Sequence, residues 1–180
     1  CNFDISLNPG IKGNGNVVEE TRPLNGTFNA IKAIEGLEVY LTQSNSEGVI
    51  VEADENLQDL IVAEIIDGTL KIHTKKNIGW ASAKKVHVNF KNVSKISASS
   101  GTRVHSNTII TAENLELSSS SGSNMIVDVK TSKLKCESSS GSGMTLNASA
   151  KVLECSASSG SNIKLSGETI KLLAKASSGS

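Results

Sequence analysis

In the second half of the chain, hydrophobic and polar residues alternate, and a short serine run ending in glycine interrupts the alternation at regular intervals. The five glycines, 21, 19, 19 and 19 residues apart, are Gly101, Gly122, Gly141, Gly160 and Gly179. Apolar or small residues stand seven, five and three positions before each glycine and three and five positions after most of them. Alternation with a period of two is typical of strands with one buried face, so each repeat is predicted to form strand, turn and strand.

A repeat of about 19 residues cannot bury its apolar side alone, so consecutive repeats must stack as rungs about 4.8 Å apart. The glycine is expected at a corner with a positive φ angle, where serine hydroxyls bond free backbone groups. A flexible serine-glycine linker is the alternative, but linkers do not keep leucine and isoleucine in register over four repeats. Residues 94–180 are therefore predicted to form a single-stranded, right-handed parallel β-helix in an all-β protein.

The first half contains short apolar runs that are rich in valine and isoleucine and broken by glycines, which favours strands. The runs are Phe28 to Ile34, Leu37 to Leu41, Val49 to Ala53, Leu60 to Ile66, Leu70 to Ile72 and Val86 to Phe90. Asp67-Gly68 predicts a hairpin, and Glu55 to Leu60 a short helical turn. We expect a flexible leader over residues 1–21 and a β-rich region over 22–93 that starts or caps the solenoid.

Composition and charge argue against two classes of protein, nucleic-acid binders and proteins with a transmembrane helix. The chain has 180 residues, a formal net charge of zero and only 3% aromatic residues. Neither half has the basic excess expected of a nucleic-acid binder, and no stretch approaches the apolar length of a transmembrane helix.

Three segments of the first half, together with the repeated Ser-Gly turns of the second half, resemble a known family. We call these repeated turns the Ser-Gly ladder. The three segments are Phe28-Asn29-Ala30-Ile31, the acidic run from Val49 to Leu57, and Gly68-Thr69-Leu70-Lys71-Ile72. With the ladder, they resemble the head GIN domain family, described as auto-transporter adhesins, over residues 22–180. The resemblance implies a β-helical protein of the Gram-negative cell envelope, often a lipoprotein, and brings no catalytic residues. The first rung departs from the family's usual Ser-Gly-Ser, since Thr102 follows Gly101.

Cys1 is the candidate for lipid attachment, because a bacterial lipoprotein begins at a diacylated cysteine once its signal is cleaved. The glycine- and asparagine-rich stretch from Asn8 to Asn16 would then tether the solenoid to an outer membrane. The alternative is a chain that merely starts at an arbitrary cysteine.

Cys136 and Cys155 occupy the same position of consecutive repeats, so both are expected to point inward one strand spacing apart. Neighbouring parallel strands seldom offer the dihedral angle of a disulfide, which favours free thiols acting as small hydrophobic groups. No histidine or further cysteine stands at matching positions, so we expect neither a metal site nor a cofactor.

The sequence contains few candidate catalytic residues. β-Helix enzymes that cleave acidic polysaccharides need clustered Asp, Lys and Arg, whereas the ladder half has one Arg and one Asp, Arg103 and Asp128. His73, His87 and His105 are too far apart in sequence to suggest pairing with a nucleophile, and are expected as surface strand residues. The chain is therefore predicted not to be an enzyme.

The segment from His73 to His87 is the candidate ligand-binding loop. It places Trp80, the only tryptophan, between the pairs Lys75-Lys76 and Lys84-Lys85. An exposed indole beside these lysines could stack on a sugar or lie at an anionic headgroup surface. The favoured interpretation is instead that Trp80 folds back over the solenoid end while the lysines are simply solvated.

The acidic segment from Glu52 to Glu55 could hold calcium through clustered carboxylates. The favoured interpretation is a solvated turn after a strand.

These observations favour a non-enzymatic envelope module that presents a rigid β-helical surface to glycans or proteins. The alternatives are a purely structural envelope lipoprotein and a polysaccharide-active β-helix enzyme. The ladder stops directly after its fifth corner, at Ser180, so its open end is expected to be covered by further residues or by another subunit in a homo-oligomer.

Overall fold

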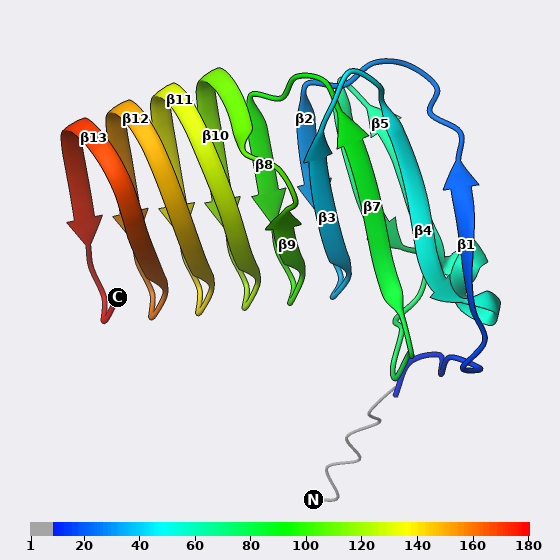
Figure 1. The fold of residues 1–180 in the computed structure, drawn as a ribbon. Helices are drawn as coiled ribbons and strands as arrows, with labels where there is room; N and C mark the ends of the chain where they lie inside the picture. Colours follow the sequence, from blue (N-terminus) through cyan, green and yellow to red (C-terminus); the bar gives the residue numbers. More distant parts are fainter. Residues whose placement is uncertain (1–8) are drawn as a thin grey trace, which may run out of the picture.

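The computed structural model describes residues 9–180, and the predicted lipid-attachment residue Cys1 lies outside them. The chain forms an all-β solenoid of stacked rungs, which confirms the predicted parallel β-helix (Figure 1). The strands are β1 (Val17–Arg22), β2 (Ala30–Ala33), β3 (Glu38–Gln43), β4 (Gly48–Asp54), β5 (Ile61–Ile66), β6 (Thr69–Thr74), β7 (Lys84–Phe90), β8 (Lys95–Ala98), β9 (Arg103–Ser106), β10 (Ile110–Ser119), β11 (Asn124–Ser138), β12 (Gly143–Ala157) and β13 (Asn162–Ala176). One 3-10 helix, η1 (Glu55–Leu60), stands where the sequence predicts a helical turn.

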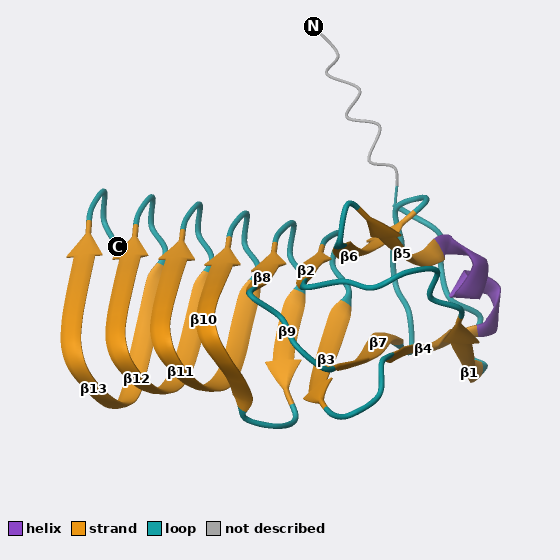
Figure 2. Ribbon diagram, turned by 90° about the horizontal axis from the view of Figure 1, so that it is seen from above, coloured by secondary structure: helices purple, strands orange, loops and turns teal. Residues whose placement is uncertain are grey.

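Each late rung is one long strand that bends in the middle and ends in a tight turn (Figure 2). The strands β11, β12 and β13 pair in parallel and in register along both arms, with Met125 opposite Met144 on one arm and Leu134 opposite Leu153 on the other. The solenoid therefore has two walls. Wall A contains β1, β4, β7, β3, β9 and the first arms of β11 to β13. Wall B contains β5, β6, β2, β8 and the second arms of β10 to β13.

Two edges join the walls. The corner edge carries the Ser-Gly turns, and the bend edge carries the smooth bends of the long strands. The core lies between the walls and is built from aliphatic side chains, with Phe28 and Phe90 as its buried aromatic residues.

At every corner, the serine before the glycine and the glycine itself both have positive φ angles, 53° and 70° for Ser140 and Gly141. The N–H of Ser142 bonds the carbonyl of Ser139 at 3.2 Å, which makes each corner a type I′ turn. The prediction of a positive φ at the glycines is confirmed. The left-handed serine before each of them was not expected.

The first-half strands join the same stack instead of forming a separate sheet. β2 and β3 form a rung whose corner, Glu35-Gly36, has two positive φ angles like the Ser-Gly turns. β6 and β7 form the preceding rung, pairing in parallel with β2 and β3. Antiparallel strands then end both walls, β4 and β1 on wall A and β5 on wall B.

The segment expected to be a flexible leader differs from that expectation from Ile11 onward. Val17–Arg22 forms β1, which pairs with β4, and Ile11 bridges to Ile78. The backbone N–H of Asn14 donates a hydrogen bond to Oδ1 of Asn56 in η1 at 2.9 Å. The glycines and asparagines of this segment predict flexibility when only the sequence is considered. Contacts with residues distant in sequence nevertheless hold the segment in place.

Candidate functional site

The outer face of wall A brings aromatic, acidic and basic side chains together. The register places Tyr40 between His87 and His105 in one row, and Glu38 between Lys85 and Arg103 in the neighbouring row. These residues face outward because the alternating positions of the same strands, such as Val39, Val86 and Val104, are buried. We call the two rows together the wall A cluster, which also includes Glu52 on β4.

The three rings of the cluster form a continuous stack. The ring centroids of Tyr40 and His87 are 5.3 Å apart at an interplanar angle of 20°, and those of Tyr40 and His105 are 5.4 Å apart at 17°. A ring therefore covers each face of Tyr40, and the Tyr40 hydroxyl donates to Glu38 at 3.4 Å. Ile50 and Ile126, partly exposed on either side, extend the row along the solenoid axis.

Charged groups beside the rings are paired. Glu52 accepts hydrogen bonds from Lys85 Nζ and His87 Nε2, each at 2.9 Å, and Arg103 Nη1 bonds Glu38 at 3.0 Å. The bonds from Lys85 and His87 lower the pKa of Glu52, and the bond to Glu52 raises the pKa of Lys85. A carboxylate held ionised by two partners is suited to orient groups for binding, and it is a weak proton acceptor at neutral pH.

Sequence spacing could not reveal this cluster. His87 and His105 were expected as separate surface residues, and each does lie on a strand, but the parallel register brings them to opposite faces of Tyr40. The alternation of outward residues was visible in the sequence. The pairing of β3 with both β7 and β9 was not.

The residues of the candidate ligand-binding loop lie in two separate places in the structure. Lys85 belongs to the wall A cluster through Glu52, and Lys84 begins β7. Lys75, Lys76 and Trp80 lie in the connection from β6 to β7 on the corner edge. Trp80 is 59% exposed, so the indole does not fold back over the solenoid end. The structure adds Lys12, whose Nζ lies 5.6 Å from the centroid of the Trp80 ring.

The acidic segment from Glu52 to Glu55 is neither a solvated turn nor a shared ion site. Its three carboxylates point to different partners: Glu52 to Lys85 and His87, Asp54 to backbone N–H groups of Gly15 and Ala83, and Glu55 to the side-chain amide of Asn16. Among the described residues, no group of three or more His, Cys, Asp and Glu side chains could hold a metal ion.

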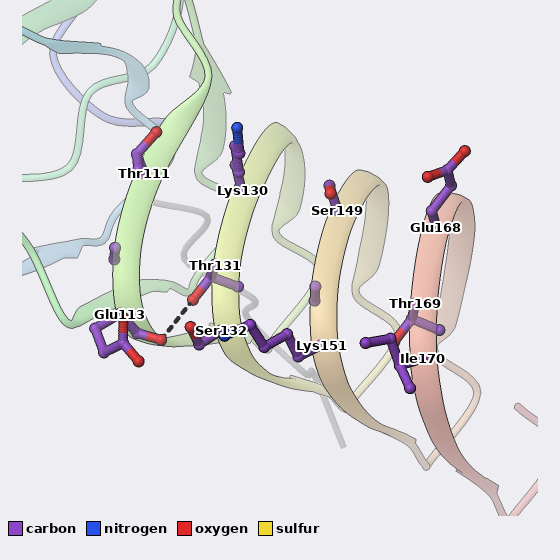
Figure 3. A pocket seen from close by; sticks show the side chains of 12 residues that line it. Thr111, Glu113, Lys130, Thr131, Ser132, Ser149, Lys151, Glu168, Thr169 and Ile170 are labelled. Carbon is purple, nitrogen blue, oxygen red and sulfur yellow. Dashed lines mark hydrogen bonds between the residues drawn. The ribbon is translucent and has the colours of Figure 1, made fainter.

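A groove runs along the bend edge across four rungs, with a volume of about 540 Å³. Figure 3 shows its two lips, where outward side chains splay apart at each bend. Thr111, Lys130 and Glu168 lie on one lip, and Glu113 and Lys151 on the other. The Thr131 hydroxyl bonds the carbonyl of Glu113 at 3.0 Å and so fixes neighbouring bends to each other. The groove is open and carries charges of both signs, which suits a weak contact surface more than an enclosed ligand.

The corner serines divide into exposed and internal groups. Ser121, Ser140 and Ser159 are exposed, but Ser123, Ser142 and Ser161, which directly follow Gly122, Gly141 and Gly160, are buried. The Ser142 hydroxyl donates to the carbonyl of Ser119 on the preceding rung at 2.7 Å and accepts from the N–H of Ser139 at 3.1 Å. These hydroxyls bond corner backbone groups, as predicted, and they also join neighbouring rungs, so they are not available to a ligand.

Cys136 and Cys155 are free, buried and directly opposite each other in the β11–β12 register. The hydrogen bond with Cys155 and burial both raise the pKa of Cys136. The pair thus contributes to the core as free, buried thiols, in agreement with the favoured expectation.

Within the described residues, no helix is long and apolar enough to cross a membrane.

Comparison with known proteins agrees with this architecture. The chain resembles a "putative lipid binding protein" from Parabacteroides distasonis, with 22% identity and a TM-score of 0.81 over 88% of this chain and 70% of the other. A "putative adhesin" from the same organism matches with 17% identity and a TM-score of 0.61 over 93% of this chain and 99% of the other. A "putative adhesin" from Parabacteroides merdae matches with 17% identity and a TM-score of 0.56 over 93% and 98%. At these identities, the likeness shows the fold.

No curated protein matches the chain. A family model does match residues 27–180, which confirms the resemblance read from the first-half segments and the ladder. The chain therefore belongs to the family described as "Putative auto-transporter adhesin, head GIN domain".

Proposed function

We propose that this protein is a non-enzymatic adhesion module of the cell envelope, and that the wall A cluster is its binding surface for a glycan or a protein. The observation that carries the proposal is the stack of His87, Tyr40 and His105 beside paired charges on a rigid wall. Aromatic and charged side chains held in fixed positions lose little conformational entropy on binding. Membership of an adhesin family supports the same conclusion.

The geometry favours binding over chemistry. Glu52 and Glu38 are each engaged by cations, and no hydroxyl or thiol nucleophile lies within hydrogen-bond distance of a histidine in the interactions found for residues 9–180. A surface spread over several rungs also suits an extended partner that runs along the solenoid axis.

A cell-envelope location, with attachment through a lipid on Cys1, is part of the proposal. The family description supports the envelope location. Mass spectrometry of the native protein after envelope fractionation tests it: a diacylated Cys1 supports the attachment, and an unmodified Cys1 contradicts it.

Binding of the purified chain to glycan arrays and to immobilised cell-surface material tests the adhesion function. We expect Tyr40→Ala to lower binding at least about tenfold, because removal of the central ring leaves the two imidazoles unsupported. Thr145→Ala is the matched control, since Thr145 lies in the same outward row on β12, two rungs away from the rings. Equal binding by both variants would contradict the assignment of the surface. Failure of the unmodified chain to bind any array or surface would contradict the adhesion function itself.

A further inference from the structure

The loop of residues 75–83 occupies a special place on the corner edge. It connects β6 to β7, which pair in parallel with β2 and β3, so it stands where Glu35-Gly36 and the Ser-Gly turns stand in later rungs. The later corners are tight turns, whereas this connection has room for a tryptophan and two lysines. We call residues 75–83 together with Lys12 the Trp80 loop.

Backbone contacts hold the Trp80 loop in place. The N–H of Ile11 bonds the carbonyl of Asn77 at 2.8 Å, and the N–H of Gly13 bonds the carbonyl of Trp80 at 2.8 Å. Gly10 and Gly79 approach so closely that neither has space for a Cβ atom. Ile78 is buried beneath the loop. The indole is therefore exposed on a fixed backbone, and its exposure does not result from a loose loop.

The lysines of the Trp80 loop carry free charge. Lys12, Lys75 and Lys76 are exposed, and none is within salt-bridge distance of a described carboxylate. Two acidic side chains near the loop accept hydrogen bonds from neutral groups and not from its lysines. Glu35 accepts from the N–H and hydroxyl of Thr74, and Asp54 accepts from backbone N–H groups. The loop thus presents an indole beside three lysines that form no salt bridge with a described carboxylate.

We infer that the Trp80 loop is a contact site for an anionic lipid surface. An indole prefers the headgroup level of a bilayer, since its ring is apolar and its N–H is polar. Each lysine near an anionic surface adds attraction that salt weakens. A neutral glycan would use the indole but would leave three free lysines without a role. The site lies on the corner edge, apart from the wall A cluster, so it does not depend on the proposed adhesion surface.

The single tryptophan makes the test direct, because all indole emission comes from Trp80. The protein carries Cys1→Ser, so that no acyl chain supplies membrane affinity. It is mixed with phosphatidylcholine vesicles, with or without phosphatidylglycerol, at about 0.1 M and about 1 M salt, where the Debye length falls from about 10 Å to about 3 Å. We expect a blue shift of emission and co-sedimentation with the anionic vesicles only, both reduced severalfold at high salt.

Variants separate the contributions. We expect the double variant Lys75→Glu/Lys76→Glu to lower vesicle binding at least about tenfold. We expect Trp80→Ala to lower vesicle binding severalfold. Binding of this variant is measured by co-sedimentation, because it has no indole emission. The control Lys130→Glu/Lys151→Glu makes the same charge change on the bend edge and should leave binding unchanged. Thermal unfolding of each variant shows whether the loop variants remain folded.

Three outcomes would overturn the inference: no blue shift with anionic vesicles, an equal shift with neutral vesicles, or an equal loss in the bend-edge control. A blue shift with neutral oligosaccharides but not with vesicles would assign the loop to glycan binding instead. If vesicle binding is lost while wall A binding persists, or the reverse, the two surfaces are shown to act separately.

Discussion

Asp54 holds Gly15 in place: the carboxylate oxygen Oδ2 accepts the backbone N–H of Gly15 at 2.8 Å, although the two residues are 39 positions apart. The other oxygen, Oδ1, accepts the N–H of Ala83 at 2.9 Å. One fully buried side chain thus joins the N-terminal segment, the end of β4 and the Trp80 loop. Burial alone would raise the pKa of Asp54, but bonds from the N–H groups of Ala83, Gly15 and Ser82 outweigh it and lower the pKa.

Removing this carboxylate should destabilise the protein. We expect Asp54→Ala to lower the free energy of unfolding by about 3 kcal/mol, because it leaves several buried N–H groups without a partner. Urea denaturation followed by circular dichroism measures the change. If Asp54→Ala lowers the free energy of unfolding no more than the exposed control Asp128→Ala does, Asp54 does not hold these segments together.

The same group predicts an acid-sensitive stability. The pKa of Asp54 is lower in the folded protein than in the unfolded chain, so its contribution is complete above about pH 4 and is lost as the pH falls through the folded pKa. Asp54→Asn cannot titrate, so its stability should change less over this acid range. Parallel denaturation curves from neutral pH down to about pH 2 test this, and equal slopes for both proteins would contradict it.

The corner hydroxyls should stabilise unequally. Ser142→Ala removes a bond to the preceding rung and is expected to cost about 1 kcal/mol. Thr102 occupies the equivalent position of the first Ser-Gly corner, and its buried hydroxyl is the one side-chain oxygen in the described residues found buried without a partner. Thr102→Val should therefore be neutral or stabilising. If both substitutions destabilise equally, the inter-rung bond is not the source of the difference.

Two glycines close together in sequence should respond differently to alanine. Gly141 has a φ of +70° and no atom within 4 Å of an added Cβ, so Gly141→Ala should cost about 1–2 kcal/mol through backbone strain alone. Gly143 does not have a positive φ, and an added Cβ would make only ordinary contacts with Asn124 and Asn162. Gly143→Ala should be neutral or slightly stabilising. Thermal melts of the two variants provide the comparison, and an equal fall in Tm would contradict the role of the left-handed turn.

The last rung predicts self-association of the 180-residue chain. Leu172 is 54% exposed although its register partner Leu153 is buried, because β13 is the last rung among the described residues. Light scattering should show a mass that rises with concentration, and Leu172→Glu should reduce it. Leu173→Glu changes a leucine on the outer face of the same strand and should not. A monomer at all concentrations would contradict an end-to-end homo-oligomer.

The alternation of apolar residues around Gly101 to Gly179 was sufficient to predict the rungs, their register and their corners. A period-two pattern repeated every 19 residues has only one efficient way to bury its apolar side, and a stacked repeat places equivalent residues above one another. Thr69–Thr74 and its hairpin partner were predictable for a similar reason, since Asp67-Gly68 specifies a local turn. These are short-range preferences, which the sequence displays directly.

Contacts between distant segments were not predictable in this way. Nothing near Glu35-Gly36 indicates that it is a corner of the same solenoid, because about 60 residues separate it from the next one. The wall A cluster depends on β3 pairing with both β7 and β9, and the exposure of Trp80 depends on backbone bonds from Ile11 and Gly13. The sequence by itself determined the repeating coil, since its periodicity is local. Only the tertiary structure decided which side chains meet on its surface, because strand pairing over long separations depends on the whole packed fold.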